Sequence, residues 1–218
     1  MVDRVDVFSR EDEDVLRIVD YKSGAKKLSA AGVAEGWQLQ LWVYLQTLCR
    51  TWEERTGRKA VPGGVYYAPV GDDFANVTEE EGVSDRVRMQ GWAVADPDIL
   101  AASDHSLQGP GDSSRFLSLD IGSRGYLSSQ VKSPEDFRVL LDGAVDTARQ
   151  LAQSMKDGEI APRALQQGQQ SACEYCAYKA LCGLQGKKET ISSAGERQAM
   201  QKLRERLQEG EDDGQTVD

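Results

Sequence analysis

The feature that most constrains this chain is a pair of alternating segments joined by a short polar loop near its start. The first segment covers residues 2–8, the second covers residues 16–24, and residues 9–14 between them are all polar. Alternation of polar and apolar residues is the period of a β-strand, and a short polar connection is typical of a hairpin. The sequence therefore predicts a β-hairpin at this position.

The register of this hairpin decides which side chains meet at its open end. A symmetric fold about the loop places Val5 opposite Ile18 and Asp3 opposite Asp20. Lys22 follows two residues after Asp20, so it points to the same face of the strand. Two facing carboxylates roughly 5 Å apart repel each other unless positive charge lies between them. The hairpin therefore predicts a cation site at its open end.

Two interpretations of these polar side chains stay open from spacing alone. In the first, hard carboxylate oxygens bind a divalent cation, with Mg²⁺ as the first candidate and Lys22 beside it. In the second, the hairpin ends in ordinary solvated charges. Short D-x-K strings are common, and a register slip of one residue would move every side chain to the other face.

Composition and charge limit the classes of protein to consider. The chain has 218 residues, 39% hydrophobic and 28% charged, which suits one globular domain with a real core. No apolar run is long enough to cross a membrane and no secretory signal opens the chain, so its four cysteines favour a reducing, cytoplasmic location. A net charge of −10 means that any DNA must meet a local basic groove or another chain. No G-x-x-x-x-G-K-[ST] phosphate loop is present.

A helix is predicted after the hairpin, over residues 36–49, because its apolar residues recur on one helical face. Gln40 and Tyr44 are four residues apart and therefore adjacent at the edge of that face. An amide and a phenol side by side can orient a phosphate or a metal-bound water, and the alternative is a half-buried boundary pair. We interpret Cys49, in the same helix, as a core residue.

Three further elements are predicted downstream. They are a strand at residues 63–70, a hairpin at residues 116–127 and a long helix that begins after Ser133 and ends at Gly158. Serine is a good N-cap, and glycine commonly ends a helix. His105 is the one histidine of the chain, and it lies in a Gly- and Ser-rich loop without a recognisable partner.

Three cysteines lie close together near the C-terminus. Cys173, Cys176 and Cys182 have the spacing C-x2-C-x5-C. In a reduced protein this spacing favours a zinc ion or an iron–sulfur cluster. Both normally have four protein ligands, so Cys49, His105 or a segment further upstream would have to complete the set.

Three of these signatures together resemble one known family. They are an aspartate in the strand before I-V-D-Y-K-S-G, the Q-L-W-V-Y helix and the cysteine spacing. The combination is similar to the iron–sulfur branch of the PD-(D/E)XK nucleases, and within it to the C-terminal nuclease domain of AddB-type subunits of bacterial helicase–nucleases. The resemblance covers nearly the whole chain and includes G-V-Y-Y at 64–67, R-M-Q-G-W-A-V-A-D-P at 88–97 and D-G-E-I-A-P at 157–162.

The resemblance implies an α/β fold, in which a restriction-endonuclease-like core has a central mixed sheet flanked by helices and a C-terminal cysteine-pinned segment. The nuclease domain would cover residues 1–190 and include an iron–sulfur segment at residues 159–186. Residues 191–218 would form a polar helix and an acidic, disordered tail. We expect the domain to be truncated at its N-terminus, because members of the family carry an upstream helix with an acidic or histidine active-site residue.

The resemblance also implies roles for residues of the hairpin. Asp3 and Asp20 would bind Mg²⁺ together with the backbone carbonyl of Tyr21. Lys22 would orient or activate the attacking water and stabilise charge on the phosphate. Hydrolysis of a phosphodiester needs a metal to polarise the phosphoryl oxygen and a nucleophile available at neutral pH, so these roles agree with the first interpretation of the hairpin.

Roles for the helix and the cysteines follow from the same resemblance. Gln40 and Tyr44 match a Q-x-x-x-Y helix that helps to bind DNA near the active site. Cys173, Cys176 and Cys182 would be three of the four ligands of a [4Fe-4S] cluster. Family members carry their first cluster cysteine far upstream, so we expect weak activity and poor retention of iron from this chain alone.

The function expected from these observations is that of a Mg²⁺-dependent DNA exonuclease domain. It would hydrolyse one unwound strand, the 5′-terminated one, in double-strand-break repair and in partnership with an AddA-type helicase–nuclease subunit. One alternative is a CRISPR-associated adaptation exonuclease, which shares the hairpin and the cysteine spacing. The other alternative is a truncated, non-catalytic remnant that binds DNA or acts as a scaffold.

Overall fold

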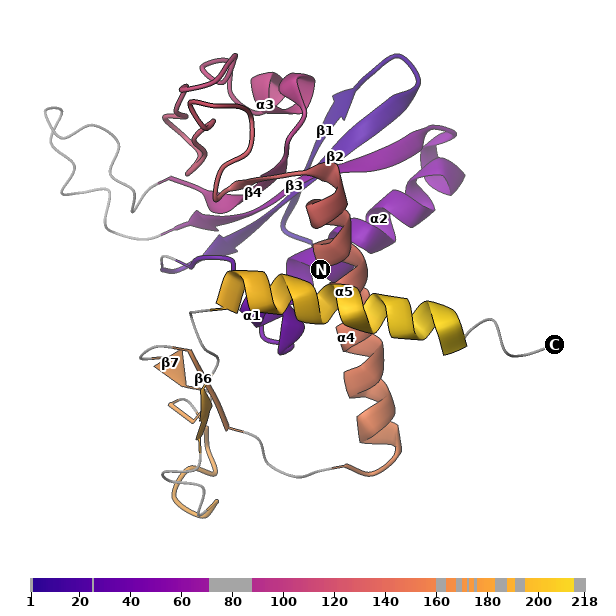
Figure 1. Ribbon diagram of the computed structural model, residues 1–218, viewed down its shortest axis with the longest axis vertical. Coiled ribbons are helices and arrows are strands. Elements are labelled where there is room, and N and C mark those ends of the chain that lie inside the picture. The colour runs from indigo at the N-terminus through magenta and orange to yellow at the C-terminus, as the bar shows by residue number, and fades with distance from the viewer. Residues whose placement is uncertain are drawn as a thin grey trace, which may run out of the picture. The chain divides into compact units, whose positions relative to one another are not determined.

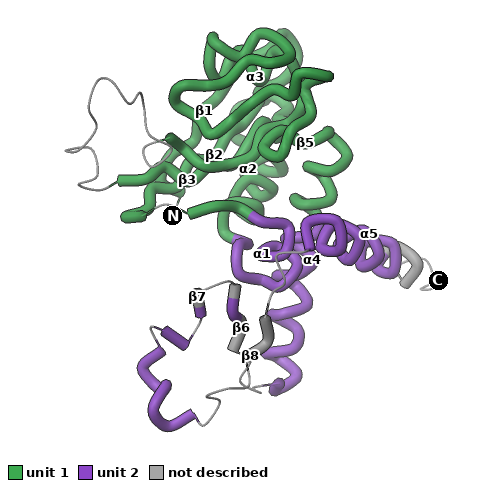
Figure 2. The backbone as a smooth tube through the Cα atoms, turned by 60° about the vertical axis from the view of Figure 1, so that its left-hand side comes forward, with its two compact units in different colours: residues 1–28, 40–142 green, residues 29–39, 143–218 purple. Residues whose placement is uncertain are grey.

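The structure is a computed structural model in which the chain forms two compact units, coloured separately in Figure 2. The first unit comprises residues 1–28 and 40–142, and the second comprises residues 29–39 and 143–218. The residues that the structure describes are 2–24, 26–70, 88–159, 164–167, 170–171, 173–174, 176–182, 188–190 and 195–213. Among them, no helix combines the length and the apolar character that a membrane span requires.

A five-stranded mixed sheet forms the centre of the first unit (Figure 1). The strands lie in the order β1-β2-β3-β4-β5; β1 and β2 are antiparallel, as are β3 and β4, whereas β2 and β3, and also β4 and β5, are parallel. Their bounds are β1 Arg4–Ser9, β2 Glu13–Lys22, β3 Lys59–Pro69, β4 Gln90–Val94 and β5 Val131–Lys132. The predicted α/β class with a central mixed sheet is confirmed.

The hairpin of β1 and β2 has the register that the sequence predicts. Val5 pairs with Ile18 and Val7 pairs with Leu16. The last pair toward the open end of the hairpin is Arg4 with Val19, so Asp3 lies one residue before the start of β1. Strand β2 has β3 on its other side, so it is a central strand with apolar residues buried on both faces, which explains its nearly continuous apolar run.

Helix α2, Gln40–Thr56, covers one face of the sheet and runs opposite to β2. At its start Gln40 contacts Asp20, and near its end the Trp52 indole donates a hydrogen bond to Asp14. The six residue steps of β2 from Asp14 to Asp20 rise roughly 20 Å, and the helix between the two partners rises about 18 Å. The match in length lets α2 contact both ends of the same strand.

The predicted start of this helix is four residues too early, because residues 36–39 form the turn that separates α2 from a short preceding helix. Helix α1, Ala30–Ala34, follows the N-cap Ser29, whose hydroxyl accepts a hydrogen bond from the Gly32 N–H at 2.9 Å. The sequence pattern does not predict this helix. Small apolar residues buried over little more than one turn give too short a periodic pattern for detection.

The other face of the sheet is covered by helix α3, Pro97–Ser103, and by the long loop that follows it. The predicted hairpin at residues 116–127 is wrong. Its alternating apolar residues pack against the sheet, and the contacts made there are two isolated bridges, Met89–Leu117 and Ser113–Asp120. The buried cluster on this face consists of Val19, Tyr66, Ala68, Ala93, Leu100, Leu107, Leu117, Leu119, Ile121 and Val131.

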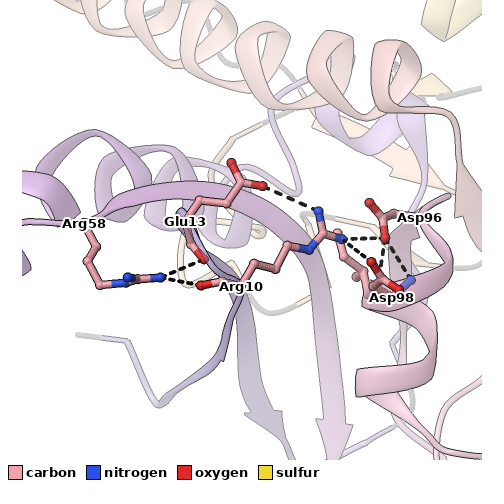
Figure 3. A network of polar contacts seen from close by, with 6 residues as sticks. Arg10, Glu13, Arg58, Asp96 and Asp98 are labelled. Carbon is pink, nitrogen blue, oxygen red and sulfur yellow. Dashed lines mark hydrogen bonds and ion pairs between the residues drawn. The ribbon is translucent and has the colours of Figure 1, made fainter.

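The loop end of the hairpin is held by two arginines (Figure 3). Arg58 donates to Asp14 Oδ1 at 2.9 Å and to the Arg10 carbonyl at 2.6 Å. Arg10 in turn places Nη2 at 2.5 Å from Asp96 Oδ1, and Asp96 is also the N-cap of α3. These contacts join the hairpin loop, the start of β3 and the start of α3 into one polar network.

The second unit contains α1, the later part of helix α4 and a small sheet. Helix α4 spans Pro134–Lys156, which confirms the predicted long helix, and Ser133 caps it through a 3.1 Å bond from the Asp136 N–H. The small sheet has the order β7-β6-β8, with bounds β6 Ala164–Gln167, β7 Gln170–Ser171 and β8 Lys188–Thr190.

Helix α5, Glu196–Asp213, ends the described part of the chain. It packs on α1, where Lys202 pairs with Glu35 at 2.5 Å and Arg206 donates to the Ala34 carbonyl at 2.8 Å. The helix includes acidic residues that the sequence analysis assigned to a disordered tail. Residues 214–218 lie outside the described part of the chain. The division into 1–190 and 191–218 stays a prediction.

Candidate active site at one end of strand β2

Asp20 lies near the end of β2 and begins a row of buried polar side chains. Its partner on β3 is Tyr67, and the partner of Tyr67 on β4 is Gln90. The three side chains point to the face of the sheet that α2 covers, because Trp92, two residues after Gln90, contacts Trp42 of α2. Their exposures are 5%, 6% and 8%, respectively. A buried polar row therefore crosses three strands at this end of the sheet.

Two side chains contact the Asp20 carboxylate. The Lys22 ammonium lies 2.5 Å from Oδ2, and the Gln40 amide donates to Oδ1 over a long 3.4 Å. The lysine contact is an ion pair without the direction of a hydrogen bond, so no described group donates a hydrogen bond to the buried Oδ2. Buried carboxylate oxygens normally have such donors, so this one is available to a further ligand.

Asp3 lies at the same end of the strand. Its Oδ2 accepts a hydrogen bond from the Tyr21 N–H at 3.0 Å, and its side chain is exposed, unlike that of Asp20. The Asp3 side chain is therefore hydrogen-bonded to Tyr21, the residue that follows Asp20 in β2. Binding of one metal ion by both carboxylates stays a prediction.

Tyr67 is a neighbour of Lys22 and Asp20 that the sequence analysis missed. Its ring centroid is 5.8 Å from Lys22 Nζ, within the range of a cation–π interaction. Burial, together with the negative charge of Asp20, raises the pKa of Tyr67 to about 12, so its phenol is neutral at pH 7. The strand that carries Tyr67 was predicted, but its parallel pairing with β2 leaves no local signal in the sequence.

The start of α2 adds a second favourable feature for an anion. Gln40 is the first residue of the helix, and Tyr44 follows one turn later, half-buried. The N-terminus of a helix carries partial positive charge and unpaired N–H groups, which favour a phosphate. The predicted pair Gln40 and Tyr44 therefore belongs to the element that contacts Asp20.

The donor set at this end fits a divalent cation of the Mg²⁺ type. Asp3 and Asp20 offer carboxylate oxygens, Tyr21 between them in the site contributes its backbone carbonyl as a further oxygen, and no described residue donates a hydrogen bond to Oδ2 of Asp20. Within the described ranges no group of three or more His, Cys, Asp or Glu side chains gathers to hold a metal. Mg²⁺ suits such a sparse set, because it is usually held by one or two carboxylates and keeps waters or phosphate oxygens as its other ligands.

The predicted cluster ligands are less well arranged. Cys173 is half-buried, Cys176 and Cys182 are exposed, and none of the three is in a disulfide. Among the described residues these thiols form no group of three or more metal ligands, so binding of an iron–sulfur cluster stays a prediction. Cys49 is a poor fourth ligand, because burial raises the pKa of its thiol to about 12. His105 belongs to no metal-binding group in the described part of the chain.

Comparison with known proteins gives a consistent result. The family model described as "PD-(D/E)XK nuclease superfamily" matches residues 1–183. The chain is 33% identical over 190 residues to the B subunit of the ATP-dependent helicase/deoxyribonuclease of Clostridium novyi (strain NT), covering 83% of this chain and 16% of the relative. It is 30% identical over 189 residues to the protein of the same name from Alkaliphilus oremlandii (strain OhILAs), with the same coverage. The chain thus spans only a small part of the curated relatives that it matches.

Proposed function

Because the chain belongs to the PD-(D/E)XK nuclease superfamily, we propose that the end of β2 that carries Asp20 hydrolyses phosphodiester bonds of DNA with a divalent metal ion. The observation that supports this most directly is the buried Asp20 carboxylate, which has a lysine beside it and an oxygen without a hydrogen-bond donor. A carboxylate in this state is costly for stability alone and useful for binding a cation.

In this proposal each residue at the Asp20 end of β2 has a distinct role in the reaction. Asp3, Asp20 and the Tyr21 carbonyl hold Mg²⁺, which when bound polarises a phosphoryl oxygen and makes a water more acidic. Lys22 donates to a phosphate oxygen or holds the attacking water, and its ammonium stabilises the charge that develops on the phosphate. Gln40 at the start of α2 orients the same phosphate.

Two further residues support this machinery. Tyr67 places its neutral ring against the Lys22 ammonium and so limits the positions that the ammonium adopts. Tyr44 lies one helical turn from Gln40, where it contacts the DNA strand beyond the reacting phosphate.

The similarity to the B subunits of helicase/deoxyribonucleases suggests the setting of this reaction. We propose that the chain is the nuclease part of such a subunit. It would act as an exonuclease on the unwound 5′-terminated strand during double-strand-break repair, alongside an AddA-type helicase–nuclease subunit. Cys173, Cys176 and Cys182 would bind a [4Fe-4S] cluster only when a fourth ligand is supplied. Iron analysis after anaerobic reconstitution should find far less than one cluster for each isolated chain, and a stable full cluster would contradict this.

A cleavage assay tests the enzymatic proposal. The purified chain should cleave end-labelled single-stranded DNA with Mg²⁺ and not with EDTA, and Asp20→Ala and Lys22→Ala should each abolish cleavage. Asp12→Asn is the matched control, because Asp12 is an exposed aspartate in the hairpin loop, away from the site. Cleavage that survives both alanine changes would remove these residues from the mechanism. A chain that binds DNA without cutting it under any divalent metal would favour the non-catalytic alternative.

A further inference from the structure

A tight turn displays an aromatic side chain at one edge of the first unit. Ser114 is 1% exposed, and its Oγ accepts hydrogen bonds from the N–H groups of Phe116 at 3.2 Å and Leu117 at 2.9 Å. The same hydroxyl donates to Asp104 Oδ2 at 2.5 Å. Leu117 is 1% exposed, whereas Phe116 is 65% exposed. The turn is therefore anchored on both sides of a phenylalanine that it holds in solvent.

Pairing with Met89, just before β4, fixes the end of the sheet at which Phe116 lies. The Met89 N–H donates to the Phe116 carbonyl at 3.0 Å, the Ser118 N–H donates to the Met89 carbonyl at 2.7 Å, and Met89 and Leu117 form a parallel bridge. Met89 and Leu117 both pack into the cluster on the α3 side of the sheet. Phe116 itself lies at a bend of the chain and is 65% exposed, so its side chain extends into solvent beside the start of β4.

This placement puts Phe116 at the end of the sheet that carries Asp20. The segment of Phe116 is the third neighbour of β2 along this end of the sheet, after β3 and β4. Neighbouring strands lie about 4.8 Å apart, so Phe116 is roughly 15 Å from Asp20. A single phosphate at Asp20 does not reach that far, whereas a strand of several nucleotides does.

We propose that Phe116 stacks on an unpaired base of the DNA strand whose phosphate lies at Asp20. Phe116 is then a specificity-determining residue for unpaired DNA, and this inference rests on the proposed function. An exposed aromatic ring accepts any base on its face, while the bases of a duplex are already stacked on one another. Arg115, next to Phe116, is also exposed and offers a guanidinium to the backbone phosphates.

A single exposed apolar residue is common on protein surfaces and by itself carries no meaning. Three observations set Phe116 apart. Its turn is anchored by the buried Ser114, its neighbour is a cation, and it lies at the same end of the sheet as the candidate active site. A ring fixed in advance loses little conformational freedom on binding, which favours a binding role.

The first test compares two substrates in the presence of Mg²⁺. One is an oligothymidylate long enough to pass from Asp20 to Phe116, and the other is thymidine 5′-(p-nitrophenyl phosphate), which is too short. Phe116→Ala should raise KM for the oligonucleotide roughly tenfold, leave kcat nearly unchanged and leave the small ester unaffected. Phe116→Trp should keep the wild-type KM. An unchanged KM for the oligonucleotide, or an equal rise for both substrates, would overturn the proposal.

The second test measures binding without cleavage, by fluorescence anisotropy of a labelled oligothymidylate in EDTA. Phe116→Ala should weaken binding roughly tenfold, and tryptophan but not leucine should restore it. If this pattern appears in a chain that cuts no DNA, stacking stands and the nuclease proposal fails. If the chain cuts DNA but Phe116→Ala binds as tightly as the wild type, stacking is overturned. Restoration by leucine, or no binding by the wild type, would overturn it as well.

Phe8 supplies the matched control. It is a phenylalanine of β1 that is 37% exposed and pairs with Val15, near the loop end of the hairpin. Phe8→Ala should leave both KM and binding unchanged. An equal loss in Phe8→Ala and Phe116→Ala would mean that any exposed ring contributes, and the assignment to Phe116 would be wrong.

Discussion

Strand β2 carries a buried carboxylate near each end, and the two have very different partners. Asp14 and Asp20 point to the same face, are 4% and 5% exposed, and are both contacted by α2. Asp14 accepts hydrogen bonds from the Trp52 indole at 2.8 Å and the Arg58 guanidinium at 2.9 Å. Asp20 has one long hydrogen bond and an ion pair without hydrogen-bond direction.

The difference separates a carboxylate held by two hydrogen-bond donors from one that we propose to bind a metal ion. Arg58, one of the two donors of Asp14, belongs to the network that joins the hairpin loop to α3, so this end of the sheet is cross-linked (Figure 3). A buried carboxylate whose oxygens are all satisfied stabilises the fold, whereas an incompletely satisfied one costs free energy until a ligand arrives. The number and direction of the donors, rather than burial, therefore distinguish the end of β2 that we propose to be functional from the other end.

The largest expected effect is that of Asp20→Asn on catalysis. The change removes the charge that would bind the metal, so kcat for single-stranded DNA should fall by at least about 10²–10³-fold. The melting temperature should stay within ~2 °C of the wild type, because little hydrogen bonding is lost. Circular dichroism melts and single-turnover cleavage measure the two quantities. A large drop in melting temperature would show that Asp20, like Asp14, is structural.

Asp14→Asn should give the reverse result. The amide cannot accept from both Trp52 and Arg58 as the carboxylate does, so a buried donor loses its partner. The melting temperature should fall by roughly 5–10 °C, while kcat of the folded protein stays near the wild-type value. Unchanged stability would remove the contrast between the two ends. Asp12→Asn, in the exposed loop, is the control.

Lowering the pH should reduce the stability that Asp14 contributes to the fold. The indole of Trp52, then Ser9 and Arg58, hold the pKa of Asp14 below its usual 3.8. A lowered pKa in the folded state contributes stability that is present above the unfolded pKa and is lost as the pH falls through the folded value. Urea unfolding should show the wild type losing stability below about pH 4, with a smaller loss in Asp14→Asn. Parallel curves for the two proteins would contradict this.

The smallest expected effect is that of changing Tyr67, which lies beside Lys22 and tests the Asp20 end of β2 further. Tyr67→Phe keeps the ring against Lys22 and should leave kcat nearly unchanged, whereas Tyr67→Leu removes the cation–π contact and should lower kcat about threefold. Comparing the pH profiles of kcat tests whether the ring acts through the lysine. An identical profile and kcat in the leucine variant would leave Tyr67 with a packing role only.

The parts of the site that the sequence could predict are those that lie close together in the chain. The hairpin register and the common direction of Asp20 and Lys22 follow from alternation over a short loop. The adjacency of Gln40 and Tyr44 follows from the helical period. These are local rules, and each needs only one or two elements.

The parts that could not be predicted depend on pairing between distant strands. Tyr67 and Gln90 reach the site because β3 pairs with β2 and β4 pairs with β3, and no local pattern specifies these partners. The false hairpin at residues 116–127 has the same origin. Leu117 and Leu119 alternate as in a strand, but they fill the core beside β4 instead of pairing with a second strand.

The span of α2 from Trp52 to Gln40 has a consequence for how homologous chains can vary in length. Removing one residue between these positions would turn the start of the helix by about 100° and shift it by about 1.5 Å. Gln40 would then leave Asp20 even though the Trp52 contact persisted. Insertions and deletions should therefore accumulate outside the stretch from Gln40 to Trp52. The length of this stretch must stay constant for α2 to contact both ends of β2.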